Sequence, residues 1–326
     1  MTDSRSYGYT DTLSAEHYAR ALRADIRDGL ARTPKTTAPK WFYDAWGSEL
    51  FEQITQLPEY PVWRAELGLL QLHAHDIAVR TGARSLTELG SGSSTKTKLI
   101  IEALGSKGLR YVPVDVSADA LHQASTQLVQ EYPGIIVHAL RADFTAPLVL
   151  PEPPGDEPRL IAFLGSTLGN FRQPVRGPFL EGLRSIMRPE DHLLIGADLV
   201  KDEREMLAAY DDSQGVTSEF DKHLLQVLNR ELDADFDPDS FDHVSVWNSA
   251  ERHIEMRLRS RVEQRVKIRE LDLAVYFALG EEWITESSAK FTTDGLQAEL
   301  AAAGLRTDQL WSDTGAGFAL VLATAR

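Results

Sequence analysis

The 326-residue chain contains no cysteine. Disulfide bonds, thiolate metal sites and cysteine nucleophiles are therefore excluded. The chain also lacks any apolar run near the roughly 20 residues that a membrane-spanning helix needs. Its first residues, MTDSRSYGYTD, do not have the basic start and apolar middle of a secretory signal. We therefore expect a cytoplasmic protein that is not bound to a membrane.

Basic residues are scarce relative to acidic ones. The 34 Lys and Arg stand against 49 Asp and Glu, which gives a net charge of −15. Such a surface repels phosphate backbones and anionic lipid headgroups. The densest basic stretch, residues 257–269, alternates with apolar residues and is typical of solvated strand faces. We expect no nucleic-acid or membrane partner and a small-molecule ligand instead. The nine histidines have no metal-ligand spacing, so we assign no metal.

Between about residues 65 and 199, apolar strands alternate with helical stretches. We expect these strands at residues 85–89, 109–116, 134–142, 160–164 and 192–199. Tight turns cannot join parallel strands, so the intervening helices indicate crossovers. The pattern predicts an α/β, Rossmann-like domain with a mainly parallel sheet.

The pattern changes after Lys201. Helices are expected at residues 203–211 and 216–233, followed by a segment in which Ile254, Met256 and Leu258 alternate with charged residues. This alternation is typical of antiparallel strands with one wet face. We predict a second, α+β domain from residues 12–63 and 201–289. The parallel-sheet domain would comprise 64–200 and 290–326, and residues 1–11 would be a flexible tail.

The most specific local motif is residues 86–94, LTELGSGSS, which follows a strand and precedes a helix. Glycine permits positive φ and lets the backbone approach a ligand closely, at the sheet edge where open α/β sheets bind ligands. Thr95 stands where the dinucleotide fingerprint has its third glycine, and no Walker lysine motif is present. The loop by itself still allows a nicotinamide dehydrogenase.

Acidic residues end the next two strands. Asp115 lies about 25 residues after the first loop glycine, near the roughly 20-residue spacing expected for an acid that binds ribose hydroxyls. Asp143 precedes Phe144, so a carboxylate for an adenine amino group would stand beside an aromatic wall. This order indicates S-adenosylmethionine, whose adenosine needs these contacts and which has no phosphate to bind. Alternatively, Asp115 only caps a helix and Asp143 is a turn residue.

Five further segments carry a family resemblance. They are residues 41–44 (WFYD), 163–171 (FLGSTLGNF), 209–212 (AYDD), 255–256 (EM) and 286–291 (ESSAKF). From about residue 12 to its C-terminus, the chain resembles the ergothioneine-pathway histidine Nα-methyltransferases. The resemblance implies a class I methyltransferase domain and a substrate-binding domain. It also implies three methylations of the α-amino group of L-histidine, which yield the betaine hercynine.

The resemblance implies a set of site residues. The cofactor contacts fall on Tyr43, Gly90, Lys96, Asp115, Asp143 and Phe144. The substrate contacts fall on Asn170 and Tyr210 for the carboxylate and on Tyr60, Glu286 and Ser288 for the imidazole, with Met256 either a contact or part of a core stripe. The sulfonium methyl is already electrophilic, so no catalytic nucleophile is assigned and the protein acts by positioning.

Glu286 and Ser288 bear on the choice of substrate. They are two residues apart on an expected strand, so their side chains share a face. A carboxylate accepts the imidazole N–H, and a hydroxyl serves the other ring nitrogen. A buried Glu286 left unpaired by an indole costs several kcal/mol, which disfavours tryptophan.

Residues 58–66, PEYPVWRAE, depart from the family pattern of Pro-Glu-Tyr-Tyr followed by an Arg and a Glu. Tyr60 is kept, but Pro61 replaces the second tyrosine and pushes Tyr60 toward extended backbone. The runner-up function is therefore an N-methyltransferase of tryptophan or another aromatic amine, with Trp63 and Trp283 lining a larger pocket. A non-catalytic S-adenosylmethionine-binding module is the alternative from another class. No coiled coil or swapped element is evident, so we expect a monomer.

Overall fold

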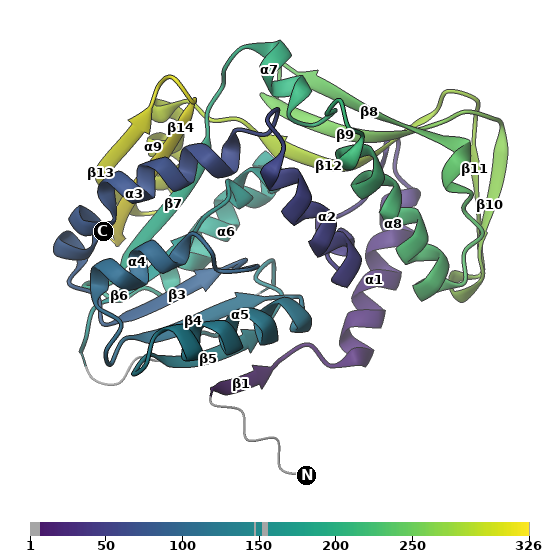
Figure 1. The fold of residues 1–326 in the computed structure, drawn as a ribbon. Coiled ribbons are helices and arrows are strands. Elements are labelled where there is room, and N and C mark those ends of the chain that lie inside the picture. The colour runs from purple at the N-terminus through teal and green to yellow at the C-terminus, as the bar shows by residue number, and fades with distance from the viewer. Residues whose placement is uncertain (1–6, 147, 152–155, 326) are drawn as a thin grey trace, which may run out of the picture. The chain divides into compact units, whose positions relative to one another are not determined.

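A computed structural model describes residues 7–146, 148–151 and 156–325 of the chain. The chain divides into two compact units (Figure 1). Unit 1 comprises residues 1–13, 62–200 and 290–326, and unit 2 comprises residues 14–61 and 201–289. The roles of cofactor-binding and substrate-binding domain stay predictions. No helix in the described part of the chain is both long and apolar enough to cross a membrane.

Unit 1 is built on an eight-stranded sheet of order β1-β5-β4-β3-β6-β7-β14-β13. Its strands are β1 (Gly8–Asp11), β3 (Ser85–Leu89), β4 (Arg110–Asp115), β5 (Ile136–Arg141), β6 (Arg159–Phe163), β7 (His192–Asp198), β13 (Leu305–Asp313) and β14 (Phe318–Ala325). The first six strands in this order, which end with β7, pair in parallel with their neighbours. Strand β14 pairs antiparallel with both β7 and β13. The predicted mainly parallel sheet is thus confirmed. The strand order reverses between β3 and β6, the place where open α/β sheets bind ligands.

The helices of unit 1 connect these strands. They are α3 (Val62–Thr81), α4 (Thr97–Leu104), α5 (Ala118–Glu131), the short 3-10 helix η2 (Thr167–Asn170), α6 (Gln173–Ser185) and α9 (Thr293–Ala302). Ser117 and Thr292 cap α5 and α9 by accepting backbone N–H groups, which satisfies donors that a helix start leaves open. Every residue of β3 and β6 is buried, as expected for parallel strands at the centre of a sheet.

The expected flexible tail at residues 1–11 is wrong for its second half. Gly8–Asp11 form β1, which pairs in parallel with β5. The ring of Tyr9 lies 4.5 Å from that of His122. Backbone hydrogen bonds to a free sheet edge require no apolar pattern, so the polar composition of the segment did not reveal the strand. Residues 1–6 lie outside the described part of the chain.

Unit 2 contains a four-stranded sheet of order β2-β12-β9-β8 and a separate hairpin. The strands of the sheet are β2 (Lys35–Thr36), β8 (Phe241–Asn248), β9 (His253–Ser260) and β12 (Glu282–Ala289); those of the hairpin are β10 (Gln264–Ile268) and β11 (Leu273–Phe277). The helices are α1 (Ala15–Leu30), α2 (Ala45–Gln56), α7 (Glu203–Ala208) and α8 (Val216–Leu232), with short 3-10 helices η1 (Pro39–Phe42), η3 (Pro238–Ser240) and η4 (Arg269–Leu271). The predicted antiparallel strands are confirmed, whereas the helix expected at 203–211 already ends at Ala208.

A β-bulge divides β12. Ile284 pairs with Arg257 and Glu286 pairs with Met256, so Thr285 is the extra residue. A bulge shifts the alternation of side chains along its strand. Glu282 therefore faces one side of the sheet with Arg257 and Arg259, although its spacing from Glu286 alone would put both glutamates on one face.

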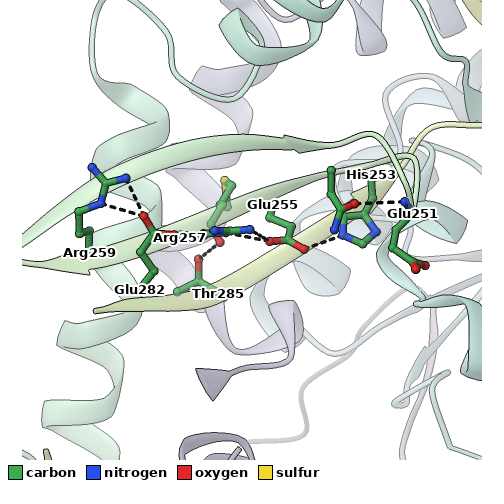
Figure 2. A network of polar contacts seen from close by, with 9 residues as sticks. Glu251, His253, Glu255, Arg257, Arg259, Glu282 and Thr285 are labelled. Carbon is green, nitrogen blue, oxygen red and sulfur yellow. Dashed lines mark hydrogen bonds and ion pairs between the residues drawn. The ribbon is translucent and has the colours of Figure 1, made fainter. Parts of the chain in front are cut away.

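Charged side chains form a ladder along that side of β9 and β12 (Figure 2). His253 contacts Glu255 over 2.6 Å, and Arg257 bridges Glu255 and Glu282. Glu282 also accepts hydrogen bonds from Arg259. The wet face that we expected beside Ile254, Met256 and Leu258 thus contains a buried carboxylate, because Glu255 is only 3% exposed.

Candidate active site

The glycine loop of unit 1 is tied to the acid at the end of the next strand. Gly90 and Gly92 have positive φ, 69° and 47°. Asp115 accepts the N–H of Gly92 over 3.0 Å and that of Ser117 over 2.9 Å. Burial raises the pKa of Asp115 above its ordinary value, although these N–H donors oppose the rise. Asp115 thus holds the loop, whereas Ser117 caps α5, and each carboxylate oxygen of Asp115 keeps a lone pair for a hydroxyl.

Phe144 lies against the same loop. A Cβ on Gly90 would lie 3.6 Å from the Phe144 ring, and a Cβ on Gly92 would meet nothing within 4 Å. Asp143 accepts the N–H of Thr145 over 2.8 Å, so its carboxylate also takes part in a turn. The backbone of the neighbouring Ala142 is bonded to Asp115. The glycine loop therefore lies near an aromatic face, that of Phe144, and near the carboxylates of Asp115 and Asp143. These groups fit the adenosine of S-adenosylmethionine.

Lys96, a predicted cofactor contact, forms an ion pair with Glu66 of α3. Glu66 is fully buried and also accepts the backbone N–H of Gly165 over 2.9 Å. The turn at Gly165 follows β6 and leads to η2, which ends at Asn170. Glu66 therefore connects the start of α4 to the turn at the reversal of strand order. The sequence alone assigned no function to Glu66. The feature that could have indicated one is its position at the charged end of the segment PEYPVWRAE.

A second buried carboxylate, that of Glu88, is connected to the glycine loop through Tyr111 and Ser94. Glu88 of β3 accepts hydrogen bonds from the hydroxyls of Thr97 and Tyr111. The Tyr111 hydroxyl is also 2.8 Å from Ser94 Oγ, and Ser94 has φ of 55°. Burial raises the pKa of Glu88 to about 7, although both hydroxyl donors oppose it. This network ties Ser94 of the loop to β3, β4 and α4. The sequence alone assigned no function to Glu88.

In unit 2, predicted substrate residues from three distant segments meet. The Tyr210 hydroxyl donates to Ser288 Oγ over 2.9 Å. The ring of Tyr60 lies edge-on to that of Tyr210, with centroids 6.2 Å apart. All three side chains are buried. Pro61 therefore has not removed Tyr60 from the neighbourhood of Tyr210.

Glu286 and Met256 lie directly across from each other on β12 and β9, and Ser288 pairs with Ile254. Residues opposite each other in an antiparallel pair point to the same face. Glu286 and Met256 are 8% and 2% exposed. A carboxylate, a hydroxyl and an apolar side chain thus share one side of the sheet, the side away from the charged ladder.

Two predicted residues lie in a different unit from the rest of their groups. Tyr43, expected to contact the cofactor, belongs to unit 2, where its ring packs edge-on against Phe51 and Phe220. Asn170, expected to contact the substrate, belongs to unit 1 at the end of η2.

Trp283, which the tryptophan hypothesis placed in a pocket, is fully buried beside the rings of Phe236 and Phe277. In the described part of the chain no group of three or more His, Asp and Glu is placed to hold a metal ion.

The strand order of unit 1, with a glycine loop tied to the acid of the adjacent strand, defines a class I S-adenosylmethionine-dependent methyltransferase fold. The chain belongs to the family described as histidine-specific, S-adenosylmethionine-dependent methyltransferases, whose sequence model matches residues 22–325. The predicted family and cofactor are therefore confirmed.

Three relatives are similar to this chain over most of its length. The histidine N-alpha-methyltransferase of Mycobacterium tuberculosis is 49% identical over 305 residues, which cover 93% of this chain and 94% of that protein. That of Mycolicibacterium smegmatis is 48% identical over 313 residues, 95% of this chain and 97% of its own. A 4-dimethylallyltryptophan N-methyltransferase of Epichloe festucae var. lolii is 25% identical over 315 residues, 89% of this chain and 91% of its own. Relatives of this chain are thus named for two different substrates.

Proposed function

We propose that this protein methylates the α-amino group of L-histidine three times to give hercynine, the first step of ergothioneine biosynthesis. The observation that carries the proposal is the shared face of Glu286, Ser288 and Met256, with Tyr210 bonded to Ser288. A buried carboxylate and a buried hydroxyl on one face suit a ring with two nitrogens. The names of the two mycobacterial relatives, at 49% and 48% identity, support the same substrate.

The division of labour follows from the chemistry of the side chains. Glu286 accepts the imidazole N–H, and Ser288, whose oxygen accepts from Tyr210, donates to the other ring nitrogen. Asn170 and Tyr210 are neutral donors for the substrate carboxylate; a phenol has one O–H, so Tyr210 turns its proton from Ser288 to the carboxylate when histidine binds. No carboxylate is assigned to the α-amine, because a carboxylate there would favour the charged ammonium, which cannot attack.

Asp115, Asp143 and Phe144 hold the adenosine of the cofactor, and Tyr43, Gly90 and Lys96 complete the proposed contacts. S-Adenosylmethionine, when bound, supplies an electrophilic sulfonium methyl. The protein contributes orientation of the neutral amine toward that methyl, which is worth roughly 7–11 kcal/mol in well-oriented reactions. On this proposal, residues 64–200 and 290–326 bind the cofactor and residues 12–63 and 201–289 bind the substrate. The cytoplasmic location and the monomeric state remain predictions.

Mass spectrometry of the products tests the proposal. The protein is incubated with S-adenosylmethionine and an equimolar mixture of the proteinogenic amino acids. We expect histidine to gain three methyl groups. Glu286→Ala is expected to lower kcat/KM for histidine by about 10- to 100-fold, the cost of a charged hydrogen bond. Glu251→Ala, in an exposed turn of the same sheet, is the control.

Each other outcome has a defined meaning. Methylation of tryptophan in place of histidine would support the runner-up substrate. Binding of S-adenosylmethionine without methylation of any amino acid would support a non-catalytic binding module. Either result would overturn the histidine proposal.

A further inference from the structure

Unit 2 contains a buried histidine–aspartate pair that the proposed mechanism does not use. His243 lies on β8 and Asp221 on α8, and their side chains are 2% and 0% exposed. His243 Nδ1 lies 2.7 Å from Asp221 Oδ2, and Nε2 lies 2.7 Å from the backbone oxygen of Tyr210. The pair therefore contacts the backbone of a residue whose hydroxyl is bonded to Ser288.

The geometry favours the protonated form of His243. Both ring nitrogens face acceptor oxygens, whereas a neutral imidazole has only one N–H to donate. An imidazolium, which carries an N–H on each nitrogen, satisfies both acceptors. Burial would lower the pKa of His243, but the hydrogen bond and charge of Asp221, the Tyr210 carbonyl and the charge of Asp211 raise it above its ordinary value. On β9 the residue across from His243 is the apolar Leu258.

The other oxygen of Asp221 reaches the β-bulge of β12. Asp221 Oδ1 accepts the hydroxyl of Thr285, the bulge residue, and Thr285 Oγ1 is also 3.0 Å from the Met256 carbonyl oxygen. Thr285 immediately precedes Glu286. One buried ion pair thus contacts the backbone at Tyr210 on one side and the bulge that directs Glu286 on the other.

We propose that His243 and Asp221 are positioning residues that set the specificity for histidine. They fix the Tyr210 backbone and the Thr285 bulge, and through them the Tyr210 hydroxyl and the Glu286 carboxylate. The inference rests on the proposed function. If His243 lost its proton, a buried Asp221 charge would lose its partner, which is costly in a protein interior. Both anchors would loosen together.

Two substitutions separate the two contacts of His243. His243→Gln keeps a donor near the position of Nε2, toward Tyr210, and His243→Asn keeps one near Nδ1, toward Asp221. The control is His253→Asn, which removes the Nε2 contact of another buried histidine with a carboxylate, on the opposite face of the same sheet. Thr285→Val, nearly equal in volume, removes only the hydroxyl and provides a test if the His243 variants do not fold.

The experiment measures kcat and the KM values of L-histidine and S-adenosylmethionine from about pH 6.5 to about 9.5, together with the thermal unfolding temperature. We expect both His243 variants to raise the histidine KM about 10-fold, with less than about a twofold change for S-adenosylmethionine. The wild type should show an alkaline rise in histidine KM that the His243 variants lack. Titration of the substrate amine affects all proteins alike, so the difference between profiles reports His243.

The failures are distinguishable. One outcome is that the wild type methylates histidine, but the His243 variants or Thr285→Val have the same histidine KM and pH profile as the wild type. In that case the positioning role is wrong and the proposed function stands. The same conclusion follows if His253→Asn raises the histidine KM equally. If the wild type does not methylate histidine, the proposed function is wrong and this inference falls with it.

Discussion

Gly196 lies directly against the carboxylate of Glu66. A Cβ on residue 196 would lie 1.8 Å from Glu66 Oε1, a separation that two unbonded atoms do not reach. Gly196 is in β7 and Glu66 is on α3, so the missing side chain of one residue makes room for the buried charge of the other. The same carboxylate holds Lys96 and the Gly165 turn.

Gly196→Ala is therefore expected to displace Glu66 and disturb both of its contacts. Overpacking of this kind costs about 1–3 kcal/mol in the free energy of unfolding. Because Lys96 is a proposed cofactor contact, the dissociation constant for S-adenosylmethionine should rise as well. Urea unfolding and calorimetric titration measure the two effects.

The control is Gly182→Ala on α6, where a Cβ meets nothing within 4 Å. That variant should be more stable by about 0.5–1 kcal/mol. Unchanged unfolding of Gly196→Ala would show that β7 adjusts without cost.

Tyr210→Phe removes the hydroxyl that donates to Ser288 over 2.9 Å. A hydrogen bond between neutral groups contributes about 0.5–1.5 kcal/mol. A double-mutant cycle with Ser288→Ala should give a coupling energy of that size in urea unfolding. The histidine KM of Tyr210→Phe should rise, because the hydroxyl is also a proposed carboxylate contact. Tyr276→Phe, at a tyrosine that is 51% exposed, should stay within about 0.5 kcal/mol of the wild type. A coupling energy near zero would mean that the two hydroxyls act independently.

The ladder on β9 should make the protein acid-sensitive. Burial opposes ionisation of Glu255, but hydrogen bonds from His253 and Arg257 and the charge of Arg257 lower its pKa from 4.5 to about 2. A carboxyl group with a lowered folded-state pKa stabilises the protein above its unfolded-state pKa, and the stabilisation disappears as the pH falls through the folded-state value. Its contribution above pH 4.5 is on the order of 3 kcal/mol.

Glu255→Gln should therefore lower the free energy of unfolding most above pH 4.5. The difference from the wild type should shrink as the pH falls from 4.5 toward 2. Urea unfolding in steps from about pH 6 to the start of acid unfolding measures this trend. Glu251→Gln, at an exposed residue of the neighbouring turn (Figure 2), should follow the wild type at every pH. A difference that does not depend on pH would assign the effect to packing rather than charge.

Much of unit 1 was predictable because its signals are local. Runs of apolar residues separated by helical stretches indicated the parallel strands. The loop at Gly90, the acid at Asp115 and the Asp143–Phe144 pair then met because parallel strands end at one edge of a sheet. The strand at Gly8–Asp11 was missed, because pairing to a sheet edge uses backbone groups that every residue has.

The polar networks were not predictable, because each joins residues far apart in the chain. Glu66 stands at the end of the segment 58–66, and nothing near it in the sequence indicated Lys96 and Gly165 as its partners. His243 and Asp221 lie on different elements and looked like ordinary residues of a strand and a helix. For the same reason, Glu88 had no assigned function before its contacts with Thr97 and Tyr111 were seen.

By itself, the sequence determined the family, the cofactor and the types of side chain that suit an imidazole, because these depend on residue identity, order and short-range periodicity. Only the tertiary structure decided which way those side chains point. Glu282, Glu286 and Ser288 have the same parity along β12, yet the bulge at Thr285 turns Glu282 to the charged ladder and leaves Glu286 and Ser288 beside Met256. A bulge depends on the register of two strands, and register is set by pairing between distant segments.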